Sequence, residues 1–200
     1  MKLLTQRLGL LLAFAFLGTM TTNAQDAPHW KIDNSHSSVN FTVNHFFSEV
    51  TGKFKKFSGD FNFDAENPSK SKIWFTVQIA SVDTDDQERD DHLQSEDFFA
   101  AKKYPTMNFE STSVKKKGKD SYVIDGFLTI RGTKKKVSLP MKITGVMDNP
   151  WQDGKVIMGV SIETTIDRTE YGVGTGSWAA TTIVGDEVGI KIVMELDGEK

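Results

Sequence analysis

Alternation of apolar and polar residues dominates this 200-residue chain and restricts it to a β fold. A period of two puts every second side chain on the same face of an extended strand. Turn signals such as Asn67-Pro68 and Asp153-Gly154 separate the alternating segments and are too short for helical crossovers, so they predict antiparallel pairing. The eight segments with one apolar face span residues 39–45, 57–63, 73–79, 107–111, 122–130, 137–143, 156–166 and 188–196.

Eight antiparallel strands with one apolar face predict an all-β, eight-stranded barrel, because closure removes exposed sheet edges. A two-sheet sandwich is the alternative architecture. The only helical pattern is a short connection near residues 86–101. The opposite face carries Lys, Asn, Asp, Glu and Thr, which excludes the lipid-facing exterior of a membrane barrel. An eight-stranded barrel is either filled by side chains or holds one slim ligand, and the periodicity leaves both interiors open.

The first 24 residues have the pattern of a cleaved secretory signal peptide. Lys2 and Arg7 precede an apolar run that is too short to span a membrane, and Thr22-Asn23-Ala24 supplies small residues at a cleavage site. We expect residues 25–200 to form a single periplasmic or secreted domain. Removal of the signal peptide, which holds two basic residues and no acidic ones, changes the formal net charge from −3 to −5. An acidic chain argues against nucleic acid as a partner, because phosphate binding needs a clustered basic face.

Residues 81–93 combine six acidic residues with an arginine and a histidine, a composition that is compatible with a metal site or a catalytic site. A metal site needs several ligands within reach of one ion, and no pair of histidines has the usual ligand spacing, so we predict no metal and no cofactor. No serine lies in a nucleophile elbow and the chain has no cysteine, so no catalytic residue is predicted. The candidate ligands considered were His36, His45, His92, Asp83, Asp90 and Asp91.

A structural interpretation of the cluster explains more of its residues. Asp83 or Asp85 is expected to cap the helical connection. Arg89 is expected to pair with Asp90, Asp91 or Asp167 and to fasten that connection over one end of the barrel.

The order of several motifs resembles the YceI-like family across nearly the whole chain after residue 24. The most distinctive stretch is 80–84 with 89–93 and 97–99. The other matching segments are 30–33, 35–41, 43–45, 52–54, 57–59, 104–109, 126–132, 166–168, 171–172 and 185–188. The resemblance implies a lipocalin-like barrel that is exported and binds a polyisoprenoid or related long-chain lipid, with no established catalytic machinery.

Alternation and this resemblance together give the expected ligand contacts. The residues expected to line the lumen are Phe41, Val43, His45, Phe61, Phe75, Val77, Ile79, Met107, Phe109, Leu128, Leu139, Met141, Val160, Ile162 and Ile192. Those expected at the mouth or near a lipid headgroup are Arg89, His92, Arg131 and Arg168. Transient contact with a membrane is expected for a lipid carrier, and the oligomeric state is left open, a homodimer included.

Two other functions stay open at this level. The first is an enzyme that acts on a lipid or isoprenoid quinone precursor through His45 or the Asp83–His92 cluster. The second is a stress-related scaffold with a filled core and no ligand.

Overall fold

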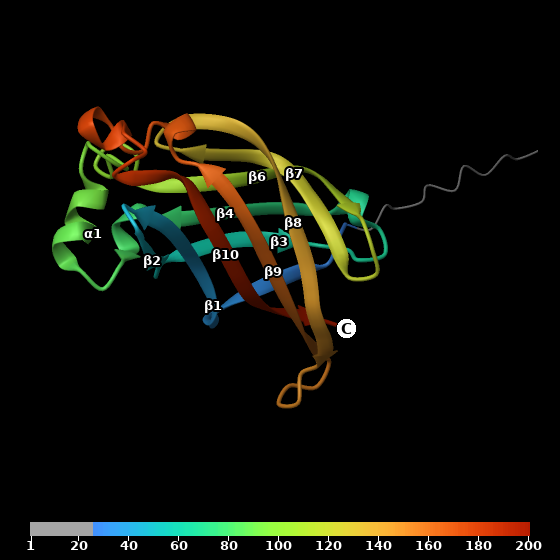
Figure 1. Ribbon diagram of the computed structural model, residues 1–200. Helices are drawn as coiled ribbons and strands as arrows, with labels where there is room; N and C mark the ends of the chain where they lie inside the picture. The colour runs from blue at the N-terminus through green and yellow to red at the C-terminus, as the bar shows by residue number, and fades with distance from the viewer. Residues whose placement is uncertain (1–25) are drawn as a thin grey trace, which may run out of the picture.

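The computed structural model describes residues 26–200, and the expected signal peptide lies outside the described residues. Within them the chain forms ten strands and one α-helix (Figure 1). The strands are β1 (His29–His45), β2 (Ser48–Phe54), β3 (Phe57–Asn62), β4 (Lys72–Gln78), β5 (Val82–Asp83), β6 (Thr106–Lys116), β7 (Ser121–Ile130), β8 (Thr133–Asp148), β9 (Lys155–Asp167) and β10 (Val184–Glu199). The helix is α1 (Gln87–Gln94), and four short 3₁₀ turns, η1 to η4, cover Pro68–Lys70, Ile79–Ser81, Thr169–Tyr171 and Gly176–Ala179.

Eight of the strands close into an antiparallel barrel. The order is β1-β3-β4-β6-β7-β8-β9-β10, and β10 pairs with β1 along most of its length, so the sheet returns on itself. This pairing excludes the sandwich. Each of the eight predicted segments contributes one strand of the ring, because their apolar faces can all be buried only when the sheet closes around them.

β2 and β5 were not predicted, and they fill a gap in the ring. β1 pairs with β3 only at His29 and Trp30, and then diverges from it. Beyond Val39, β1 pairs instead with β2 in a hairpin, and β2 pairs with β5 at Lys53 and Phe54. The wall near α1 is therefore built by β10, β1, β2 and β5.

The helical connection is shorter than predicted. α1 ends at Gln94, and residues 95–103 continue as turns, with Ala100 in the left-handed region at φ 49°. Its N-cap is Asp86, whose carboxylate accepts a hydrogen bond from the Arg89 N–H at 3.0 Å. The prediction that Asp83 or Asp85 caps the helix was wrong, because Asp85 has φ 60° and continues the turn after β5.

The two ends of the barrel differ in packing. At the end away from α1, large side chains fill the interior, among them Phe63, Tyr122, Met158 and Leu196, each no more than 2% exposed. At the other end lie α1 and the turns that follow β9, whereas the β8–β9 hairpin projects from the opposite end (Figure 1). No helix in residues 26–200 is long and apolar enough to cross a membrane.

Candidate functional site

An apolar cavity of about 180 Å³ occupies the half of the barrel nearest α1. Its wall comes from every strand of the ring and from the connections at that end. Among its 30 lining residues only Asn40, Asn108, Thr164 and Arg168 are polar or charged outside the aromatic and aliphatic set. Along β10 the lining alternates from Val188 to Met194, about 20 Å of strand at ~3.3 Å per residue. The cavity is therefore narrow, elongated and apolar.

Most of the residues expected to line the lumen do face this cavity. Alternation places them correctly because each of these strands keeps its register on the inner face. The eleven that line it are Phe41, Val43, Phe61, Phe75, Val77, Met107, Phe109, Leu128, Leu139, Ile162 and Ile192.

Four of the expected lining residues lie elsewhere. His45 is exposed at the end of β1, where the chain turns into β2, so it lies outside the cavity. Met141 and Val160 are each 1% exposed and do not line the cavity: Met141 pairs with Tyr122 in the filled end, and Val160 pairs with Met194, where the cavity lining of β10 ends. Ile79 is buried in the turn after β4, and its N–H donates to the Pro105 carbonyl at 2.9 Å.

Two connections cover the α1 end of the cavity, and we call them the lid: residues 92–99 and residues 171–178. Their aromatic rings meet: the His92 ring packs edge to face on Trp178 at 5.0 Å between centroids, and the Phe98 ring is tilted against Trp178 at 5.7 Å. The Thr175 N–H donates to the Asp97 carbonyl at 2.7 Å. Phe98, Tyr171 and Val173 are buried together beneath, so the lid closes over an apolar layer.

Arg168 fastens the second half of the lid from below. The residue is 4% exposed, and its guanidinium donates to the carbonyls of Val173, Trp178, Val184 and Gly185, at 2.6 to 2.9 Å. Burial lowers the pKa of this arginine, and the negative charges of Asp186 and Asp167 offset that effect only in part. The sequence suggested a position at the mouth or near a lipid headgroup, whereas the structure places the guanidinium against backbone carbonyls and on the cavity wall.

Arg131 and His92 hold the lid from outside the cavity, and neither lines it. Arg131 donates to the carbonyls of Glu96 and Gly172, one on each half of the lid. His92 approaches Asp97 at 3.1 Å between Nε2 and Oδ2. Both residues therefore connect parts of the lid rather than facing the lumen.

The acidic cluster does not converge on one point. Arg89 donates to the Thr84 hydroxyl and carbonyl at 2.8 and 2.6 Å, and approaches Asp86 at 4.0 Å. Its predicted pairing with Asp90, Asp91 or Asp167 was wrong. Asp90 instead accepts from Thr84 at 2.6 and 2.9 Å.

Asp83 lies apart from the other acids, beside Lys53 and Lys55. Asp86, Asp90 and Asp91 also have separate partners, namely the Arg89 N–H, Thr84 and the Gln87 amide, which suits a structural connection rather than a reaction centre.

Sequence reasoning missed the lining residues that come from the lid and from β2. Phe54 of β2, Leu93 of α1 and the lid residues Phe98, Phe99, Tyr171 and Val173 line the cavity, but these segments carry no long alternating pattern. Paired aromatics next to the acidic cluster, at 98 and 99, were the one local sign that this segment turns toward the core.

A family model described as the YceI-like domain matches residues 30–196, almost the whole barrel. The chain belongs to the YceI-like family. One relative, Protein YceI of Salmonella agona, is 41% identical over 169 residues, which cover 82% of this chain and 87% of the relative. Another, the UPF0312 protein plu2095 of Photorhabdus laumondii, is 42% identical over 139 residues, or 67% and 72% of the two chains.

Solved structures agree on the fold of this YceI-like chain. BcnA of Burkholderia cenocepacia superposes with a TM-score of 0.73 at 30% identity, covering 84% of this chain and 99% of BcnA. A polyisoprenoid binding domain from Saccharophagus degradans, at 12% identity and a TM-score of 0.64, covers 86% of this chain and 99% of that domain. At that identity the second likeness establishes the eight-stranded antiparallel fold alone.

Proposed function

We propose that this protein binds a polyisoprenoid or a similar long-chain lipid in its barrel, and carries or stores it without chemical turnover. The observation that carries this proposal is the apolar cavity between the packed end of the barrel and the lid. Its narrow shape suits a linear tail better than a compact ring system. The polyisoprenoid binding domain of Saccharophagus degradans has the same fold, which supports the choice of lipid.

The energetics favour reversible carriage. Transfer of one CH₂ from water into an apolar lumen is worth ~0.8 kcal/mol, so a tail of ~20 carbons gains ~15 kcal/mol relative to water. A tail taken from a membrane leaves an environment that is already apolar, and its net gain is small. Selectivity then depends on the shape of the cavity and on contacts at the lid.

Loading from a membrane would use the end of the barrel that carries the lid. There the turn between β1 and β2 exposes Phe46 and Phe47, at 57% and 104%. The Phe46 N–H donates to the Ile183 carbonyl at 2.9 Å, which holds this turn against the segment that leads into β10. Aromatic side chains are favoured at the membrane interface, so these two rings are our candidates for transient contact.

Export completes the proposal. The pattern of residues 1–24 predicts a signal peptide, and a lipid carrier in the periplasm, or outside the cell, would move apolar cargo through an aqueous compartment. No specific observation favours the enzyme: His45 is exposed outside the cavity, and Asp83, Asp86, Asp90 and Asp91 of the 81–93 segment each bind a different partner. The cavity weighs against a filled scaffold.

Mass spectrometry of an organic extract from the purified protein tests the proposal. We expect one long-chain lipid in near-stoichiometric amount. The protein is then delipidated and mixed with vesicles that contain a polyprenyl lipid, from which it should recover the cargo. An empty extract together with no uptake from these vesicles would refute lipid binding.

A further inference from the structure

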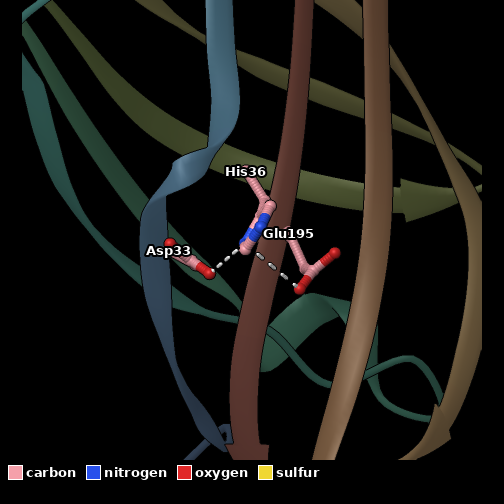
Figure 2. Close-up of side chains that lie close together, drawn as sticks. All are labelled: Asp33, His36 and Glu195. Carbon is pink, nitrogen blue, oxygen red and sulfur yellow. Dashed lines mark hydrogen bonds and ion pairs between the residues drawn. The ribbon is translucent and has the colours of Figure 1, made fainter.

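A three-residue cluster on the outer wall of the barrel brings a histidine between two carboxylates. Figure 2 shows His36 of β1 with Asp33 on the same strand and Glu195 on β10. His36 Nδ1 lies 2.6 Å from Asp33 Oδ2 and 3.9 Å from Glu195 Oε1. One ligand atom from each of the three residues falls within 4.8 Å of the other two.

A bulge in β1 creates this arrangement. Asp33 pairs with Glu195 in the ladder, but the next pair is Ser38 with Val193, so β1 carries extra residues at this point. The irregularity leaves the His36 ring 67% exposed, beside the two opposed carboxylates. Bulges re-aim side chains in this manner, and they are common next to functional sites.

Hydrogen bonds hold the Asp33 carboxylate and the bulge in place. Asp33 Oδ1 accepts from the Ser35 N–H at 2.8 Å, which leaves Oδ2 toward His36. On the facing strand the Glu195 N–H donates to the Ser37 hydroxyl at 3.1 Å, so the bulge itself is tied to β10. The Asp33 carboxylate and the backbone that carries His36 and Glu195 are thus held by contacts that need no ligand to form.

The charge of the cluster is uncompensated. Within residues 26–200, His36 is the only ion-pair partner of Asp33 and of Glu195. Two carboxylates therefore share at most one positive charge, and Asp197 adds to the negative field at His36. The surplus of negative charge around these three residues favours a cation at this position.

We propose that Asp33, His36 and Glu195 bind a divalent transition-metal ion such as Zn²⁺. Zinc takes imidazole nitrogen and carboxylate oxygen at about 2.0–2.2 Å, so tetrahedral ligand atoms lie ~3.4 Å apart. The observed separations bracket that value, and exposed side chains reach it by small rotations. Three protein ligands leave the fourth position to water. The imidazole ligand favours Zn²⁺ over Mg²⁺ or Ca²⁺, which prefer sites made of oxygen alone.

The ion would clip β1 to β10 at the point where their ladder is interrupted. None of the three residues lines the cavity, so the site is separate from the lipid. An ion that binds the native barrel and not the unfolded chain stabilises the barrel. Zinc is therefore expected to raise the melting temperature while leaving lipid content unchanged.

Isothermal titration of tag-free protein with ZnCl₂ at neutral pH tests the proposal, with MgCl₂ as the comparison ion. We expect one Zn²⁺ per chain, with affinity at least about tenfold weaker in His36→Gln and in Glu195→Gln. The matched control is His29→Gln, another exposed β1 histidine whose ring contacts the Asn62 amide rather than two carboxylates. It should bind zinc like the wild type.

A second readout covers the case in which a variant folds poorly. In NMR spectra of the wild-type protein, zinc should shift the imidazole resonances of His36 before those of His29, His45 and His92. Unchanged zinc affinity in His36→Gln would overturn the proposal. So would NMR spectra in which zinc shifts the resonances of another histidine before those of His36.

Discussion

The rings of His92 and Trp178 pack edge to face at 5.0 Å between centroids, and join the two halves of the lid over the cavity. Trp178→Ala removes this contact and the one with Phe98. Since such ring pairs are each worth about 0.5–1.5 kcal/mol, we expect unfolding free energy to fall by about 1–3 kcal/mol and bound lipid to leave several-fold faster. Stopped-flow release of a fluorescent long-chain lipid measures the rate.

The control for this prediction is Trp151→Ala. Trp151 is 84% exposed in the β8–β9 hairpin, at the end of the barrel away from the lid. Its removal should leave the release rate unchanged. Equal rates in the wild type and Trp178→Ala would show that the lid does not gate the cavity.

Arg168 is predicted to be a structural anchor of the lid. Arg168→Met leaves four carbonyl groups without their donor, and each buried unsatisfied carbonyl costs about 1–3 kcal/mol unless water reaches it. We expect a loss of at least about 3 kcal/mol in urea unfolding. Arg131→Met, which removes two donations, should cost less. A loss below about 1 kcal/mol for Arg168→Met would contradict this role.

Met141 separates packing from ligand binding. It is 1% exposed in the filled end of the barrel and does not line the cavity. Met141→Ala should therefore destabilise the protein by about 2–5 kcal/mol, the usual cost of a buried cavity, with lipid content per folded protein unchanged. Chemical denaturation and lipid extraction on the same sample check both parts. Lost lipid in a stable variant would place Met141 at the ligand.

Asp125 gives the barrel a pH-dependent contribution to stability. Hydrogen bonds from Lys115, Ser138 and Ser113, in that order of effect, hold its pKa far below the 3.8 of a free aspartate. The folded pKa is depressed, so this stability is present above pH 3.8 and is lost as pH falls toward the folded pKa. Asp125→Asn should melt below the wild type at pH 7, and the gap should narrow between pH 4 and pH 2.5. A gap that is constant over this range would argue against the linkage.

Alternation in the sequence was sufficient to predict the ring of eight strands but not to predict β2. In the wall near α1, Gly52 of β2 stands opposite Phe41, and a Cβ at Gly52 would lie 2.3 Å from the Phe41 ring. The ring fills the space that an inward side chain would occupy. The short strand therefore shows no run of large apolar residues, which is why periodicity alone missed it.

The residues of the candidate site also fall into a group that the sequence predicts and a group that it does not. Residues on long strands, such as Leu128 and Ile162, were placed on the cavity wall because a strand carries its register along its length. Lid residues such as Phe98 and Val173 depend on tertiary contacts between segments far apart in the chain. The Asp33–His36–Glu195 cluster was missed for a related reason, since Glu195 meets His36 only through the pairing of β1 with β10.

Two adjacent residues of β7 provide the matched pair for the central claim. Leu128 lines the cavity, whereas its neighbour Phe127 faces outward, with the Lys134 ammonium 4.7 Å from its ring centroid. Leu128→Trp fills space that a lipid would need, and Phe127→Trp adds the same ring on the outer face. Both variants should remain folded, since the cavity provides room for the first substitution and solvent for the second.

The deciding measurement is the lipid content of these two variants, determined by mass spectrometry of organic extracts and normalised to folded protein. The account predicts wild-type loading for Phe127→Trp and a loss of most of the lipid for Leu128→Trp. Equal loading of the two variants would contradict a lipid held inside the barrel.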